Sequence, residues 1–170
     1  HTFQWFTNVK ILTLRHVVKK RHVNNSKQRL DMIHYPISHV LKEVFQMTIG
    51  IIGFGNMGQA LAQGLLFTRS AQPGSIHASA LRQDKLRASC ARLGVTLGTN
   101  EEVAKASDLI ILAVKPWQMA EVIHQIEKDL LGKPVISVAA GISYAQLKDM
   151  LPASARGLCC IPNTPVAVGK

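Results

Sequence analysis

From Met47 onward, short apolar segments alternate with longer segments in which apolar residues recur every three or four positions. A short apolar run indicates a buried strand, and the longer spacing indicates an amphipathic helix. The predicted strands are 48–52, 75–79, 109–114, 135–139 and 157–161, and the predicted helices are 57–67, 84–93, 100–106, 119–130 and 143–151. Strands that alternate with helices through short connections are typical of a parallel sheet with right-handed crossovers. The pattern therefore predicts an α/β fold in which residues 47–170 form a doubly wound parallel sheet.

Residues 1–46 have a different composition. They hold five of the seven histidines, eight Lys and Arg against two acidic residues, and no glycine, and Met47 stands directly before the first predicted strand. We interpret residues 1–46 as a basic N-terminal extension of uncertain structure and without an evolved role. A mitochondrial presequence is one alternative, although the segment is not rich in Ser and Arg. A nucleic-acid arm around Lys19–Arg21 is another, although aromatic residues are not interleaved there.

The net charge of +10 belongs mainly to this extension, because residues 47–170 hold twelve Lys and Arg against eight acidic residues. We therefore expect no nucleic-acid partner. An apolar fraction of 47% suffices for a core, and no run of about 18 apolar residues predicts a membrane span. The three cysteines suggest neither a disulfide framework nor a metal site, which favours a reducing, cytoplasmic location. Cys159 and Cys160 lie in an apolar run and are predicted to be buried.

A glycine-rich motif carries the first functional signal. The apolar segment 49–52 runs into Gly53-x-Gly55-x-x-Gly58, and a predicted helix follows. In a Rossmann-type dinucleotide site, the first glycine permits a tight turn, the second lets the backbone approach the pyrophosphate, and the third lets the helix pack closely. The free N–H groups at the helix start then face the anion. The motif predicts dinucleotide binding; the alternative is a glycine turn with a purely structural role.

The end of the second predicted strand indicates which dinucleotide is bound. NAD-selective sites place an acidic residue there to bond the ribose 2′-hydroxyl. Here the nearest carboxylate, Asp84, belongs to the following predicted helix, whereas Ser79 and Arg82 suit a 2′-phosphate. We therefore predict NADPH as the cofactor, with NADH as the alternative. Arg82 could equally be a solvated surface residue.

Three further motifs follow predicted strands, at the sheet edge where open α/β sheets bind ligands. They are Ala-Val-Lys-Pro at 113–116, Ser-Val-Ala-Ala-Gly at 137–141 and Ile-Pro-Asn-Thr-Pro at 161–165. Together with the glycine motif, and in this order and spacing, they resemble the amino-terminal domain of pyrroline-5-carboxylate reductases from about Met47 to Lys170. That family reduces the C=N bond of pyrroline-5-carboxylate with a nicotinamide hydride, usually from NADPH, in the last step of proline biosynthesis.

The resemblance and the arguments above together give a set of candidate cofactor-binding residues. These are Ile52, Gly53, Phe54, Gly55, Asn56, Met57 and Gly58 around the pyrophosphate, Ser79, Arg82 and Asn100 on the adenosine side, and Ala113, Val114, Lys115, Pro116, Ala139, Ala140, Gly141 and Asn163 around the nicotinamide. No catalytic residue is assigned. Lys115 is the one candidate cation in the nicotinamide cleft, and a structural role for it is equally open. The set contains no metal ligand.

Two departures from the family pattern bear on these expectations. Many members carry Ser-Asn-Arg after the second strand, whereas Arg82 here stands one place later. The family also has a further helical domain, which forms the homo-oligomer and most of the imino-acid pocket, so we expect this chain to be an inactive fragment on its own. Rival interpretations are a non-catalytic dinucleotide-binding module and another NADP-dependent reductase, such as a 3-hydroxyacid dehydrogenase or an F420-dependent NADP reductase. The Pro-Asn-Thr-Pro sequence weighs against both of these reductases.

Overall fold

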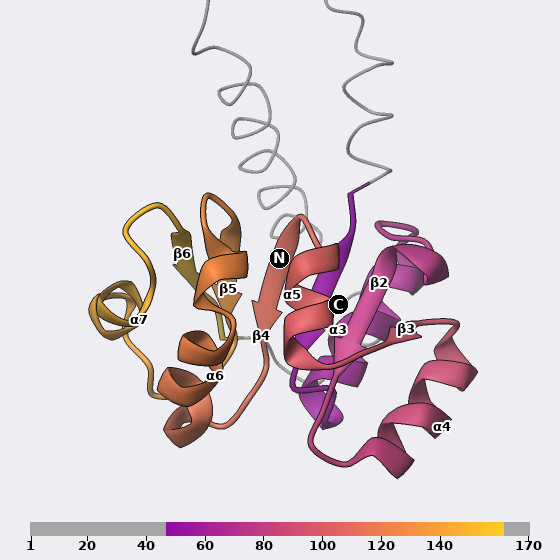
Figure 1. Ribbon diagram of the computed structural model, residues 1–170. Coiled ribbons are helices and arrows are strands. Elements are labelled where there is room, and N and C mark those ends of the chain that lie inside the picture. The colour runs from indigo at the N-terminus through magenta and orange to yellow at the C-terminus, as the bar shows by residue number, and fades with distance from the viewer. Residues whose placement is uncertain (1–46, 162–170) are drawn as a thin grey trace, which may run out of the picture. The chain divides into compact units, whose positions relative to one another are not determined.

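The computed structural model describes residues 47–161, and within them six parallel strands form a single sheet (Figure 1). In chain order the strands are β1 (Ile49–Ile52), β2 (Ile76–Ser79), β3 (Thr96–Leu97), β4 (Leu109–Leu112), β5 (Pro134–Ser137) and β6 (Arg156–Cys159). Their order across the sheet is β3-β2-β1-β4-β5-β6. The chain therefore winds outward in one direction from β1 and in the other from β4, and the predicted doubly wound Rossmann-type sheet is confirmed.

Helices connect these strands on both faces of the sheet. They are α3 (Asn56–Phe67), α4 (Gln83–Leu93), α5 (Asn100–Ala106), α6 (Met119–Gln125) and α7 (Tyr144–Met150), with short 3-10 segments η4 (Pro73–Ser75), η5 (Pro116–Gln118) and η6 (Glu127–Leu130). Helix α3 packs on α4, whereas α5, α6 and α7 pack in series. Right-handed crossovers place the first pair on one face and the other three on the opposite face, and Figure 1 shows α5 and α6 in front of the sheet.

The hydrophobic core under α5, α6 and α7 contains alternate residues of the central strands. Its buried members are Ile52, Val103, Ala104, Ile110, Leu112, Met119, Ile123, Ile126, Leu130, Val135, Leu147 and Leu151. Every residue of β1 and of β4 is buried, as expected for central parallel strands that are covered on both faces. The core fixes the register of the strands, and the register decides which loops meet at the edge of the sheet.

Three details differ from the sequence-based expectations. The predicted helix 119–130 is divided at Ile126, whose backbone (φ −110°, ψ 11°) is not helical, so α6 gives way to η6. Strand β3 was not predicted, because its two residues are both exposed and form no apolar pattern. The prediction that Cys159 and Cys160 are buried was wrong, since both are half-buried. Cys159 ends β6 and Cys160 follows it, and β6 is one of the two edge strands of the described sheet, which are covered less completely than central ones.

Helix α5 is stabilised at both of its ends. At its start, Thr99 Oγ1 accepts a hydrogen bond from Glu102 N at 3.2 Å, and Glu102 Oε2 accepts one from Thr99 N at 2.8 Å. These two bonds form a capping box, and Ser143 with Gln146 forms another. At the end of α5, Lys133 Nζ donates to Ala104 O at 2.7 Å. A cation there compensates the exposed carbonyl groups of the last turn.

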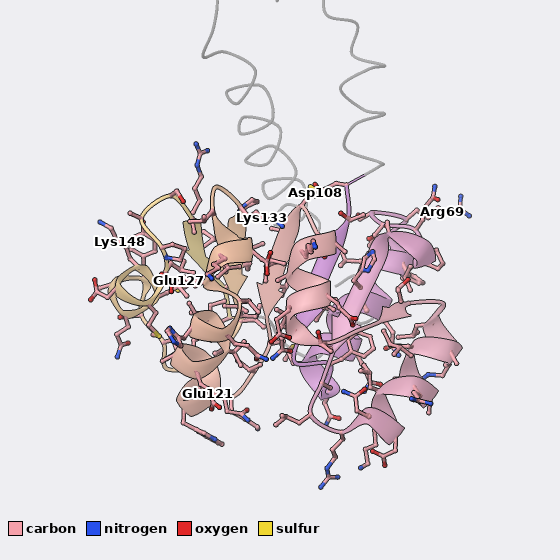
Figure 2. The ribbon with its side chains drawn as sticks, in the orientation of Figure 1. Arg69, Asp108, Glu121, Glu127, Lys133 and Lys148 are labelled. Atoms are coloured by element: carbon pink, nitrogen blue, oxygen red, sulfur yellow. The ribbon has the colours of Figure 1, made fainter. Side chains whose placement is uncertain are left out.

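We expect Lys133→Met to lower the free energy of unfolding by about 1 kcal/mol, because the terminal carbonyl of Ala104 loses a charged donor. Figure 2 shows Lys133 and Asp108 at the upper edge, where the strands begin, so the substitution leaves the opposite edge intact. Urea unfolding of the two chains measures the difference. Lys128→Met, at an exposed position of η6, is the control. Equal destabilisation by both substitutions would contradict a capping role.

Candidate cofactor site

The carboxyl ends of four strands meet at one edge of the sheet. Ile52 at the end of β1 pairs with Ser79 of β2 and with Leu112 of β4, and Leu112 pairs with Ser137 of β5. The loop that follows Ile52 is the glycine loop, residues 53–58. The segments that follow the other three strands begin at residues 80, 113 and 138. The direction of winding reverses between β1 and β4, which is where open α/β sheets bind their ligands. The sheet thus brings together the predicted segments of the site that lie within residues 47–161.

The glycine loop is held in place from two sides. The N–H groups of Gly53 and Phe54 both donate to Ser79 O, at 3.0 and 2.9 Å. Gly53 has φ of +96°, and a Cβ atom built on it would lie 2.6 Å from the carbonyl carbon and oxygen of Ala113. A residue with a side chain would therefore be strained and would collide with the end of β4. The predicted tight turn at Gly53 is confirmed.

The other two glycines of the motif have opposite surroundings. A Cβ atom on Gly58 would lie 2.5 Å from Gly53 O, so only glycine allows α3 to pack this closely against the turn. The predicted packing role of Gly58 is thus confirmed. A Cβ atom on Gly55 would meet nothing within 4 Å, and this residue is exposed. The fold itself therefore does not require glycine at position 55.

The start of α3 presents unpaired backbone donors at this edge. The first bond of the helix runs from Gln59 N to Gly55 O at 2.9 Å. The N–H groups of Asn56, Met57 and Gly58 precede it and have no partner within the helix. They lie at the positive end of the helix dipole, which favours an anion. Because Gly53 and Phe54 direct their N–H groups to Ser79 O, the donors left for a pyrophosphate belong to the start of the helix.

Two further predicted residues support this loop from inside the protein. Ile52 and Phe54 are buried, with 1% and 3% of their surface exposed. The carbonyl of Phe54 accepts from Gln59 Nε2 at 3.2 Å, and Gln59 Oε1 accepts from Arg92 Nη2 of α4, also at 3.2 Å. Gln59 and Arg92 were not among the predicted residues. No motif marks them, because their effect on the loop comes from the packing of α3 against α4.

On the adenosine side, Ser79 and Asn100 are in direct contact. Ser79 is buried, and its hydroxyl donates to Asn100 Oδ1 at 2.7 Å. In the structure the Ser79 hydroxyl directs its proton to Asn100, and its expected contact with a 2′-phosphate stays a prediction. Arg82 is exposed and immediately precedes α4, and Asp84 lies in the first turn of that helix as predicted. Arg82 is therefore the cationic donor available near the end of β2.

The segments predicted to border the nicotinamide lie at the ends of β4 and β5. Ala113 N donates to Ile52 O at 2.8 Å, which ties the end of β4 to β1, and Val138 N donates to Leu112 O at 3.0 Å, which ties the end of β5 to β4. Lys115 is exposed beside Pro116, the first residue of η5. The remaining members of the set in this region are Val114, Ala139, Ala140 and Gly141, of which the last two are exposed. Asn163 lies outside the described residues.

Two of the cysteines, Cys90 and Cys159, lie in surroundings that disfavour the reactive form of a thiol. Burial raises the pKa of the Cys90 thiol and that of the Cys159 thiol. A raised pKa keeps the sulfur protonated, and the protonated form is a poor nucleophile. Within residues 47–161, no three His, Cys, Asp or Glu side chains converge as ligands for a metal. None of the helices in this range is long and apolar enough to cross a membrane.

Comparison with known proteins assigns the chain to a family. Residues 48–141 match the model of a family described as NADP oxidoreductase, coenzyme F420-dependent. The chain belongs to this family. It is also 39% identical over 129 residues to a pyrroline-5-carboxylate reductase of Treponema pallidum, a match that covers 73% of this chain and 49% of that protein. This member of the NADP oxidoreductase family thus spans about half the length of such relatives, and the predicted resemblance is confirmed.

Solved structures agree with this assignment. A pyrroline carboxylate reductase of Plasmodium falciparum, crystallised with NADP bound, has a TM-score of 0.66 and 26% identity, and the match covers 74% of this family member and 46% of that chain. A pyrroline-5-carboxylate reductase of Coxiella burnetii has a TM-score of 0.66 and 30% identity, with coverages of 72% and 46%. The likeness thus extends through most of the described residues.

Proposed function

We propose that this chain binds NADPH and forms the cofactor-binding part of a pyrroline-5-carboxylate reductase. The observation that carries the proposal is the glycine loop, which the fold holds rigidly at Gly53 and Gly58 while the surface at Gly55 stays open. An open backbone beside three unpaired helical N–H groups fits a pyrophosphate. The 39% identity to a reductase of Treponema pallidum supports the choice of reaction.

The residues divide between the two ends of the cofactor. Gly55, Asn56 and Met57 would hold the pyrophosphate, while Arg82 and Asn100 would bind the adenosine half. The segments 113–116 and 139–141 would border the nicotinamide, and Asn163 would lie near it. The NADPH held by these residues would supply the hydride for the imine carbon, and reduction of the protonated imine would give proline. A cyclic imine is readily protonated, so the protein mainly positions the substrate and excludes water. Lys115 would contribute electrostatically.

The proposal extends to the partners and the location of the enzyme. The substrate is the small molecule pyrroline-5-carboxylate, and we expect no nucleic-acid or membrane partner. By its resemblance to the family, the parent enzyme would form a homo-oligomer through a helical domain. The thiols of Cys90 and Cys159 suit a reducing compartment, and we place the enzyme in the cytoplasm.

Two measurements test this function. The first is a fluorescence titration of the 170-residue chain with NADPH, for which we expect saturable binding. The second replaces the matching part of the Treponema pallidum reductase with this chain and measures NADPH oxidation by pyrroline-5-carboxylate, with Gly55→Ala in the same chimera as the control. Turnover by the chimera, lost when Gly55→Ala is introduced, would support the proposed reductase activity. Binding without turnover would favour a non-catalytic dinucleotide-binding module, and no binding would refute the proposal.

A further inference from the structure

A line of side-chain hydrogen bonds connects the end of β2 to helix α6. Ser79 Oγ donates to Asn100 Oδ1 at 2.7 Å, and Asn100 Nδ2 donates to Gln125 Oε1 at 2.8 Å. Gln125 Nε2 in turn donates to Glu101 Oε1. Gln125 is the last residue of α6 and lies 25 positions after Asn100 in the chain. This line therefore links the candidate adenosine site to a helix that provides none of its predicted residues.

The Glu101 carboxylate at the end of this line fixes which atom donates and which accepts in every one of its hydrogen bonds. The Glu101 carboxylate only accepts hydrogen bonds, so Gln125 must turn its NH₂ group toward Glu101 and its carbonyl toward Asn100. Asn100 must then direct its NH₂ group to Gln125 and its carbonyl to Ser79, which leaves Ser79 as the donor. The pKa of Glu101 is lowered by a hydrogen bond from its own backbone and, next, by those from Gln125 and Thr99. The carboxylate form is thus favoured at neutral pH.

This fixed direction decides what the site offers to a ligand. Asn100 Nδ2 carries two protons, of which Gln125 takes one. Asn100 is partly exposed whereas Ser79 is 1% exposed, so Asn100 offers the second proton to a ligand and Ser79 supports it from beneath. Such a donor matches the oxygen of a ribose hydroxyl, which accepts. Without Gln125, the Asn100 amide could turn over and present its carbonyl in place of the donor.

We propose that Gln125 is a positioning residue for cofactor recognition, which fixes the Asn100 amide so that Asn100 donates to a hydroxyl of the adenosine ribose. The inference rests on the proposed NADPH binding. It assigns no contact between Gln125 and the cofactor, because Gln125 acts through Asn100. Both NADPH and NADH carry this ribose, so the effect of Gln125 should be common to the two cofactors.

The first test removes Gln125 Oε1, which accepts the hydrogen bond from Asn100. In the full 170-residue chain, Gln125→Leu should weaken NADPH and NADH binding by the same factor, about fivefold, since one neutral hydrogen bond is redirected. In an Asn100→Ala background, Gln125→Leu should have no further effect, because its partner is gone. Glu121→Leu, at another exposed position of α6, is the control and should leave both affinities unchanged.

The second test exchanges the amide of Gln125 and the carboxylate of Glu101, so that the same hydrogen bonds can form again. Gln125→Glu alone keeps an acceptor for Asn100 but places two carboxylates together, so it should weaken binding. Adding Glu101→Gln supplies a donor to the new carboxylate, and we expect the pair to return both affinities to within about twofold of the original. A helix-packing role for Gln125 would predict no such rescue, because neither exchange changes the size of a side chain appreciably.

The outcomes separate this inference from the proposed function. If the unsubstituted chain binds NADPH while Gln125→Leu binds it equally well, the positioning role is overturned and the proposed function stands. An undiminished effect of Gln125→Leu in the Asn100→Ala background would also overturn it. Failure of the unsubstituted chain to bind NADPH would overturn the proposed function, and the inference with it.

Discussion

Gly58→Ala is expected to lower the free energy of unfolding by about 3 kcal/mol, the upper part of the range for forced overpacking. The added methyl group would lie 2.5 Å from Gly53 O and 3.2 Å from Ile51 Cγ2. The first of these is a backbone atom in a turn that is fixed by two hydrogen bonds to Ser79 O. The loop cannot move aside without breaking those bonds, so α3 must shift away from the sheet. Urea unfolding, followed by circular dichroism, measures the loss.

Gly55→Ala is the matched control, because it makes the same chemical change three residues earlier in an open position. Its backbone (φ −80°, ψ −159°) is accessible to alanine, so stability should change by only about 0.5 kcal/mol. NADPH binding should nevertheless weaken about tenfold or more, because the methyl group occupies the surface on which the pyrophosphate would lie. Fluorescence titration measures this effect.

This pair of substitutions separates the two roles assigned to the motif. A destabilised Gly55→Ala chain would show that the loop is less open than the structure indicates. Unchanged NADPH affinity in Gly55→Ala, with the fold intact, would favour the alternative interpretation that the glycine turn is purely structural. A fully stable Gly58→Ala chain would contradict the close packing of α3 on the turn.

The sequence was most informative where function and local backbone geometry impose the same residue. The pattern predicted the parallel sheet because β1 and β4 are buried on both faces and therefore apolar throughout. Gly53 and Gly58 were assigned correctly because each role requires the absence of a side chain, which only one residue type provides. The capping boxes at Thr99 and Ser143 can likewise be recognised from the sequence, since they depend on residues only three positions apart.

The parts that could not be predicted depend on contacts between distant segments. The hydrogen bond from the Ser79 hydroxyl to Asn100 was not predicted, because Asn100 lies 21 positions later in the chain. Gln125 carries no motif, and only the packing of α6 on α5 brings it to Asn100. The break at Ile126 was also missed, because the apolar spacing continues through it and the residue remains fully buried. Apolar periodicity reports which side chains are buried and does not show where the helical hydrogen bonding changes.

The prediction that this site selects NADPH over NADH rests on one exposed side chain, Arg82. No carboxylate stands at the end of β2, and the Ser79 hydroxyl already donates to Asn100. A 2′-phosphate would therefore take its charged donor from Arg82, which precedes α4 directly. Arg82→Gln should raise the Kd for NADPH about tenfold while the Kd for NADH changes less than about twofold, because NADH lacks that phosphate.

Arg69→Gln is the control for this prediction, because it removes the same charge from an exposed arginine at the other edge of the sheet (Figure 2). If NADPH binding depended only on the total positive charge of the chain, both substitutions would weaken it equally. A specific contact predicts that Arg82→Gln alone removes the preference for NADPH, and that the difference between the two variants shrinks as salt is raised. If Arg82→Gln lowered the affinities for NADPH and NADH equally, this arginine would lie at a part of the cofactor that both share. Unchanged affinity for NADPH would instead identify Arg82 as a solvated surface residue, and the selectivity of this site would then have to come from elsewhere on the adenosine side.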